Sequence, residues 1–152
     1  MNNASIKSVI NKAENTCRQS GSRLTPKRQQ ILEELLRAGK PLSAYNLADM
    51  YKERFGESMP PMSVYRILDF LVQEKLVHKL ASTNQYLACS HITCDHEHEI
   101  PQFLICDECN SVTEIGIKKT IIQALKDSVD STDFQMSSPQ LELHGLCKQC
   151  KK

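Results

Sequence analysis

Four of the seven cysteines in this chain stand in two identical pairs, Cys106-x-x-Cys109 and Cys147-x-x-Cys150. Each pair places two thiolates within reach of one metal ion, and two pairs complete the tetrahedral four-sulfur shell typical of structural zinc. Because this shell leaves no position for water or substrate, the predicted metal stabilises structure and does not catalyse. Two disulfides or four unrelated thiols are the alternatives. A redox function is a further one, but a redox C-x-x-C usually occurs once, at the start of a helix after a buried strand. The second pair instead follows residues 143–146 (LHGL) near the end of the chain, which fits a cluster that closes a fold.

A second set of candidate ligands lies in the middle of the chain and mixes imidazole, thiolate and carboxylate groups. Its members are His78, Cys89, His91, Cys94, His96, His98 and Glu114. A mixed shell of this kind also suits zinc. Ligands drawn from two domains and the hinge between them would make the binding energy depend on domain orientation, as a metal-operated switch requires. His91 and Cys94 are interpreted as exposed polar residues, with an additional weak site as the alternative.

The first half of the chain has the pattern of a winged helix-turn-helix. Apolar residues recur at helical spacing, and Thr25-Pro26 and Ser43 are typical of helix starts. After Lys75 the period changes to that of a β-hairpin. The predicted helices cover residues 5–20, 25–39, 43–56 and 60–73, and the predicted hairpin strands cover 76–80 and 85–89.

The second half indicates a small α+β domain that begins after a polar hinge over residues 91–101. Its predicted elements are strands at 102–106 and 111–115, a helix at 117–129 and a last strand at 134–143. A domain of this size has a small core, so a bound zinc would add needed stability. The predicted fold class is therefore α/β of the α+β type, with a winged helix-turn-helix domain over 1–90 and a zinc-bound α/β domain over 102–152.

Charge is divided unevenly along the chain, although the net charge is only +1. Residues 1–80 carry 13 Lys/Arg against 8 Asp/Glu, whereas residues 81–152 carry 6 against 10. A basic half beside an acidic, cysteine-rich half suggests a polyanion-binding domain joined to a metal-binding one. We see no signal peptide and no apolar run of membrane length. Cysteines without an export signal favour a cytoplasmic protein with metal ligands, not membrane association.

The second helix of a helix-turn-helix pair enters the major groove of DNA with its N-terminal end first. Here that helix covers residues 62–73, and its early polar positions carry Ser63, Tyr65 and Arg66. Arginine can bridge guanine O6 and N7, while serine and tyrosine can contact phosphates or bases. Three cations near the start of the second predicted helix, at residues 25–39, are candidates for contacts with the DNA backbone: Arg23, Lys27 and Arg28. Solvated surface charge is the alternative for each of them.

Several motifs together resemble the ferric uptake regulator family, in the right order and over nearly the whole chain. They are residues 23–28 (RLTPKR), 61–68 (PMSVYRIL), the first C-x-x-C, and 144–150 (HGLCKQC). Within the family the chain is most similar to the zinc uptake regulator branch. That closer match rests on residues 43–45 (SAY), 69–71 (DFL), 77–79 (VHK) and 82–84 (STN).

The resemblance implies a homodimeric repressor of zinc uptake genes that controls them by binding double-stranded operator DNA. Residues 1–90 would bind DNA and residues 102–152 would dimerise and bind metal. Each subunit would hold two zinc ions, one structural in the four-cysteine site and one regulatory near the hinge. The zinc-loaded dimer would bind a pseudo-palindromic operator and the metal-poor form would release it. No small-molecule substrate is expected.

The resemblance also places the regulatory site at His78, Cys89, one hinge histidine and Glu114. We prefer His98 as the hinge ligand because it is nearer to the first C-x-x-C, and His96 is the alternative.

Functions of other classes fit the sequence less well. A zinc hydrolase would need a general base beside a bound water. Glu97 or Glu99 could serve, but the H-E-x-x-H pattern is absent. A thiol redox sensor would use Cys89 and Cys94, and a sensor of iron, manganese or nickel would keep the same architecture. The sequence thus predicts a regulator and not an enzyme.

Overall fold

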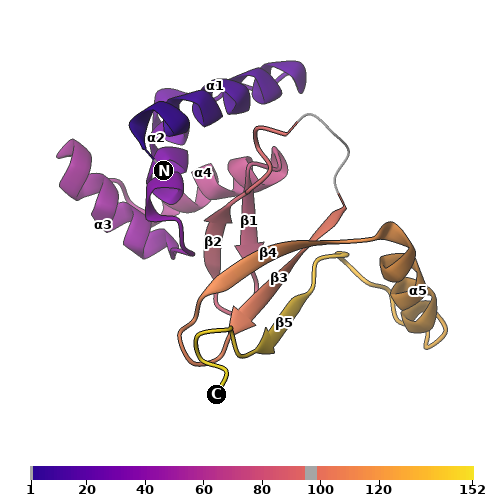
Figure 1. The fold of residues 1–152 in the computed structure, drawn as a ribbon. Coiled ribbons are helices and arrows are strands. Elements are labelled where there is room, and N and C mark those ends of the chain that lie inside the picture. Colours follow the sequence, from indigo (N-terminus) through magenta and orange to yellow (C-terminus); the bar gives the residue numbers. More distant parts are fainter. Residues whose placement is uncertain (1, 95–98) are drawn as a thin grey trace. The chain divides into compact units, whose positions relative to one another are not determined.

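The computed structural model describes residues 2–94 and 99–152, and the chain divides into two compact units, Met1–Cys94 and Asp95–Lys152 (Figure 1). The first unit includes the start of the segment predicted as a hinge. The first strand of the second unit, β3 (Ile100–Cys106), also begins inside that segment.

Four helices open the first unit, and local signals explain where they begin and end. They are α1 (Asn3–Gln19), α2 (Pro26–Ala38), α3 (Ala44–Phe55) and α4 (Pro61–Gln73). The Asn2 side chain caps α1, and Ser43 forms a reciprocal capping box with Asn46 at the start of α3. The helices α2 and α3 end at Gly39 and Gly56, whose φ angles of 59° and 71° lie in the left-handed region that glycine tolerates.

One hydrophobic core joins these helices, with α2 packed against α1, α3 and α4. Its fully buried large side chains include Ile31, Leu32, Leu35, Leu47, Tyr51, Leu68 and Leu71. This burial leaves the opposite side of α4, which carries Arg66, facing solvent.

A two-stranded antiparallel wing follows α4, formed by β1 (Val77–Leu80) and β2 (Gln85–Ala88). The strands turn at residues 81–84, where Asn84 takes a left-handed φ of 50°. Two backbone hydrogen bonds between Leu42 and Tyr86, 2.9 and 2.8 Å long, fix the wing to the segment before α3. The winged helix-turn-helix prediction is confirmed.

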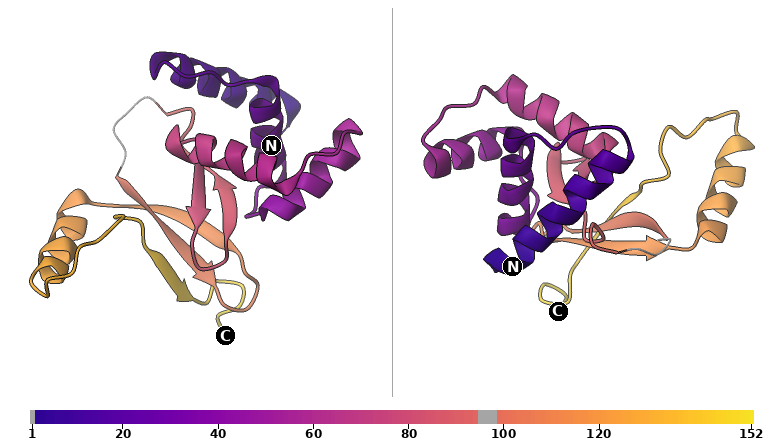
Figure 2. Two further views of the ribbon diagram at one scale, coloured as in Figure 1. Left: turned by 180° about the vertical axis from the view of Figure 1, so that it is seen from behind. Right: turned by 90° about the horizontal axis from the view of Figure 1, so that it is seen from above.

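The described part of the second unit contains a three-stranded sheet in the order β4-β3-β5. One helix connects β4 to β5 in the chain. The antiparallel neighbour of β3 is β4 (Val112–Ile117), and its parallel neighbour is β5 (Glu142–Gly145). The helix α5 (Lys119–Asp130) lies beyond one end of the sheet in both views of Figure 2. The predicted α+β class is confirmed for the described residues.

A buried glutamine side chain determines where β5 begins. Gln102 is 0% exposed, its Nε2 donates to the Pro139 carbonyl at 2.8 Å, and its Oε1 accepts a hydrogen bond from the Leu141 backbone N–H. The sequence predicted a last strand over 134–143, but ladder pairing starts only at Glu142, opposite Phe103. The ladder starts later than predicted because the Gln102 side chain occupies the Pro139 carbonyl and the Leu141 N–H. The Leu141 carbonyl accepts a backbone hydrogen bond from Phe103 N–H at 3.1 Å, and Pro139 has no N–H to donate. From Glu142 the strand runs until Gly145 stands opposite Cys106.

Candidate metal centres and nucleic-acid interface

The four cysteines of the two C-x-x-C pairs meet at one end of the sheet in the second unit. Cys106 ends β3, Cys109 lies in the turn that follows, and the other two cysteines follow β5. All four sulfur atoms lie within 4.8 Å of one another, and Cys109 Sγ and Cys147 Sγ are 3.7 Å apart. Sulfur atoms 2.3 Å from a central zinc stand about 3.8 Å apart along the edge of a tetrahedron. The donor set and its spacing therefore fit zinc.

Each C-x-x-C pair forms a tight turn whose backbone amides are directed toward the cluster. Asn110 N–H donates to the Cys106 carbonyl at 2.9 Å, with Asn110 in the left-handed region at φ 56°. In the second pair, Cys150 N–H donates to the Cys147 carbonyl at 3.0 Å. Between the pairs, Cys147 N–H donates to Cys106 Sγ at 3.4 Å. The first two bonds close the turns, and the Cys147 amide stabilises negative charge on the Cys106 sulfur.

The thiol pKa values in the cluster diverge for a physical reason. Hydrogen bonds from the backbone amides of Cys109 and then Cys147 lower the pKa of Cys106 to about 6. The pKa of Cys147 is lowered chiefly by the backbone amide of Cys150. The pKa of Cys150 is raised to about 12, first because its thiol hydrogen-bonds to Cys147 and then because of burial. A cluster that holds some thiolates readily and shares the remaining protons has the electrostatics of a cation site.

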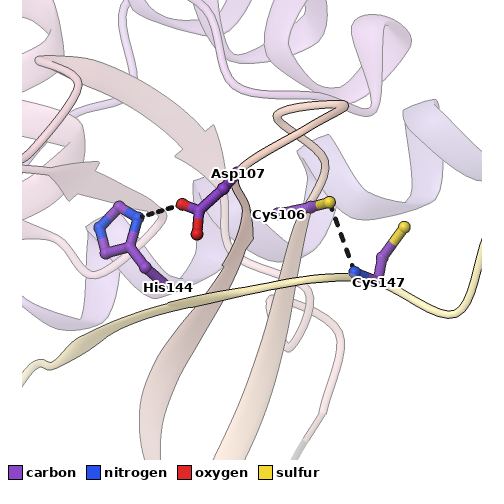
Figure 3. Close-up of polar contacts among 4 residues, drawn as sticks. All are labelled: Cys106, Asp107, His144 and Cys147. Atoms are coloured by element: carbon purple, nitrogen blue, oxygen red, sulfur yellow. Dashed lines mark hydrogen bonds and ion pairs between the residues drawn. The ribbon is translucent and has the colours of Figure 1, made fainter. Parts of the chain in front are cut away.

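A polar contact outside the sulfur atoms joins the two chain segments that carry the cysteine pairs (Figure 3). Asp107 Oδ1 and His144 Nδ1 are 3.1 Å apart, and Asp107 N–H donates to the Gly145 carbonyl at 2.8 Å. No sequence motif marks this pair beyond the position of His144 before the second C-x-x-C. Both side chains are about half exposed, so the contact orients the two segments more than it stabilises them.

Two of the candidate ligands in the middle of the chain lie close together in the wing. His78 is on β1 opposite Leu87, Cys89 directly follows β2, and a ring nitrogen of His78 lies within 4.8 Å of Cys89 Sγ. Cys89 N–H donates to the Leu76 carbonyl at 2.9 Å, and Cys89 Sγ accepts from His91 N–H at 3.5 Å. Both side chains are half-buried. An imidazole and a thiolate on one hairpin form half of a tetrahedral zinc shell.

The other candidate ligands of this set are less fully described. Glu114 is half-buried on β4 in the second unit, opposite Phe103. His96 and His98 fall outside the described residues. His91 and Cys94 are half-buried and form one turn, closed by Cys94 N–H donating to the His91 carbonyl at 3.1 Å. Within residues 2–94 and 99–152, neither His91 nor Cys94 joins a group of three or more candidate ligands.

The predicted DNA-contacting residues of α4 occupy its first two turns. Arg66 is exposed, and Ser63 and Tyr65 are half-buried at the edges of the same face. The opposite face is anchored by Val64 and Leu68, which are fully buried. The N-terminal end of α4, started by Pro60-Pro61, therefore presents polar groups to solvent on a fixed helix.

The three cations predicted near the start of α2 differ in their surroundings. Arg23 and Lys27 are exposed. Arg28 is half-buried and its guanidinium carbon lies 3.6 Å from the centre of the Phe70 ring, while its Nη1 donates to the Arg23 carbonyl at 2.7 Å. No helix in the described part of the chain is long and apolar enough to span a bilayer.

Comparisons with known proteins agree on one family. The model of the Ferric uptake regulator family matches residues 19–144. The zinc uptake regulation protein of Escherichia coli (strain K12) is 33% identical over 150 residues, which are 99% of this chain and 85% of that protein. Among solved structures, a zinc uptake regulator complexed with zinc and DNA gives a TM-score of 0.81 at 31% identity, covering 95% of this chain and 94% of that one. A crystal structure of holo XcZur gives a TM-score of 0.78 at 38% identity, covering 94% of this chain and 96% of that one.

Proposed function

The chain belongs to the ferric uptake regulator family, and we propose that it is a zinc-responsive transcriptional repressor that binds operator DNA as a zinc-loaded homodimer and controls zinc uptake genes. The relatives that match over nearly the whole chain include zinc uptake regulators, one of them in complex with zinc and DNA. The observation that carries the proposal is the His78–Cys89 pair, because it places two zinc-type ligands on the wing of a DNA-binding fold.

Structural zinc would be held by Cys106, Cys109, Cys147 and Cys150. When bound, the ion would stabilise the deprotonated form of all four cysteines. Its binding free energy would also add to the folding free energy of the second unit. The chain's own part is to bring the two turns together through the β3–β5 ladder and to direct backbone amides at the sulfur atoms. A four-sulfur shell is closed, so this metal would take no part in chemistry on a substrate. We therefore propose a regulator without enzymatic activity, acting in the cytoplasm.

The regulatory zinc would be bound by His78, Cys89, His98 and Glu114, with His96 as the alternative to His98. Support for this set is the closeness of His78 and Cys89 on one hairpin and the family resemblance of the positions. Because the remaining ligands come from the second unit, zinc would bind best in one relative orientation of the units and would favour that orientation in return. The count of two zinc ions per subunit follows from these two sites.

DNA would be read by the N-terminal end of α4. Arg66 is free to contact a base in the major groove, with Ser63 and Tyr65 beside it, while Arg23 and Lys27 are exposed cations suited to phosphates. A two-fold dimer presents two such helices, so the operator would be a pseudo-palindrome.

A second copy of the chain would pair through the second unit, whose surface supports this proposal. The exposed large apolar side chains of that unit are Leu104, Ile121, Phe134, Leu143 and Leu146. Three of them line a groove of ≈ 380 Å³ beside the cysteine cluster: Leu104, Leu143 and Leu146. Groups of exposed apolar side chains on a small unit are typical of interaction surfaces.

The test is operator binding measured at buffered concentrations of free zinc, iron, manganese and nickel. We expect zinc to promote binding at the lowest free concentration. A shell that contains the soft Cys89 thiolate favours zinc, whereas a shell of nitrogen and oxygen ligands alone is better suited to iron or manganese. Binding that responds equally to iron or manganese would contradict the zinc assignment. DNA release by peroxide at fixed zinc would favour a redox sensor instead.

A further inference from the structure

Arg28 directs its charged group toward the protein. It is the third residue of α2, and its guanidinium carbon lies 3.6 Å from the centroid of the Phe70 ring on α4. At this distance the planar guanidinium stacks on the ring face. One arm, Nη1, is also committed to the Arg23 carbonyl at 2.7 Å. Both contacts lie within the first unit, and both fix the side chain in one orientation.

The ring that Arg28 covers stands near the C-terminal end of α4, one helical turn beyond Arg66. Residues four apart lie on the same side of a helix, so a tilt of α4 at Phe70 would displace the Arg66 side chain. Phe70 is half-buried and packs against the core of the first unit, and α2 packs directly against α4 (Figure 1). A cation near the last turn of a helix is also favoured by the helix dipole.

A second polar contact holds the same end of α4. The Ser20 hydroxyl, at the C-cap of α1, donates to Glu74 Oε2 at 2.6 Å, and Glu74 is the C-cap of α4. The C-terminal end of α4 is therefore tied to both α1 and α2, while its N-terminal end presents Arg66 to solvent. This is the arrangement expected of a helix whose angle must be fixed before it meets DNA.

We propose that Arg28 is a positioning residue that stacks on Phe70 and sets the angle at which α4 enters the major groove, instead of serving as a phosphate ligand. The proposal rests on the proposed DNA-binding function. Substitutions at Arg28 should therefore reduce the preference for operator over random DNA, and they should do so even when the positive charge is kept.

The two roles predict different responses to salt and to the choice of DNA. A phosphate ligand contributes about 0.9 to the slope of log K against log salt, equally for any duplex. A positioning residue leaves that slope unchanged, because no counterion is displaced, and lowers affinity only where the helix must fit particular bases. A merely structural residue would lower the fraction of active protein on every duplex alike.

The experiment uses the full chain with excess zinc and an operator selected from a pool of random duplexes. Arg28→Lys keeps the charge but removes the planar stack, and Phe70→Leu removes the ring without changing charge. Each should weaken operator binding about fivefold at an unchanged salt slope and unchanged affinity for a random duplex. The double variant should lose no more than either single variant, because both remove the same contact. Lys27→Gln is the matched control, an exposed neighbouring cation whose loss should lower the salt slope by about 0.9 on both duplexes.

Two results would overturn the proposal. In the first, Arg28→Lys binds the operator as the parent protein does, which would show that only the charge matters. In the second, Phe70→Leu leaves the ratio of operator to random-duplex affinity unchanged. If the parent protein selects no duplex at all, the proposed function itself fails, and the two failures are thereby distinguished.

Discussion

Replacing Cys109 with serine should unfold the second unit while leaving the first intact. The described apolar core of the second unit is small: its buried large apolar side chains are Phe103, Ile105 and Ile122. At about 1.5–3 kcal/mol for each buried side chain, these three contribute on the order of 5–9 kcal/mol. A structural zinc contributes about 10–16 kcal/mol in small zinc domains. Because the metal contribution equals or exceeds that of the core, losing one sulfur ligand should remove most of the stability of this unit.

The assay combines three measurements on the Cys109→Ser protein. Zinc content by elemental analysis should fall by one ion per chain, hydrogen exchange should lose protection in β3, β4 and β5, and sedimentation should show loss of the proposed dimer. Protection in α1 to α4 should persist, since the buried core of those helices is independent of the cysteine cluster. Cys94→Ser is the control, because it changes a half-buried thiol outside the cluster. A monodisperse, folded Cys109→Ser dimer with full zinc content would refute the reasoning.

Four further outcomes follow from the two proposed sites and from the fold. Cys89→Ser should keep the dimer and the structural zinc but lose zinc-dependent operator binding, and an unaltered response to free zinc would exclude Cys89 as a ligand. Alanine at His98 should abolish zinc regulation while alanine at His96 barely changes it, and the reverse result in the same titration would exchange their roles. Arg66→Ala should cost about 1–3 kcal/mol of operator binding if it reads a base, and unchanged affinity at physiological salt would exclude that role. Gln102→Leu removes the two hydrogen bonds that this buried side chain makes to Pro139 and Leu141 and should destabilise the second unit by about 1–3 kcal/mol, measured by denaturant unfolding of the zinc-loaded protein, where an unchanged midpoint would contradict it.

The parts of the molecule that could be predicted from the sequence are those specified by local chemistry. Helix starts and ends follow from neighbouring residues, as with Ser43 and Gly56, and the two C-x-x-C spacings need no knowledge of the fold to suggest one metal. The wing could likewise be predicted from its change of period. Each of these signals lies within a few residues of the feature it predicts.

The features missed from the sequence depend on contacts between residues far apart in the chain. Gln102 bonds to backbone groups 37 and 39 residues away, and nothing in its neighbourhood marks it as the residue that places β5. Arg28 was predicted as a DNA-contacting cation, which stays a prediction, and its stack on Phe70 could not be foreseen because it exists only when α2 packs on α4. The type of a charged residue suggests which contacts it could make, but the packing of the helices determines which contact it makes within the protein.

The two proposed zinc sites should differ in exchange because of how each is built into the fold. The four-cysteine cluster is part of the stability of the second unit, so its zinc leaves only when that unit opens, and its occupancy cannot follow small changes in free zinc. His78 and Cys89 stand instead on a hairpin that is already held without metal, by its own ladder and by the buried Leu80 and Tyr86. Zinc can leave such a site without unfolding the wing, so that occupancy there can report the free concentration. This difference requires that chelator remove one zinc rapidly and the other only at a rate set by unfolding of the second unit, and two zinc ions lost at one common rate would contradict it.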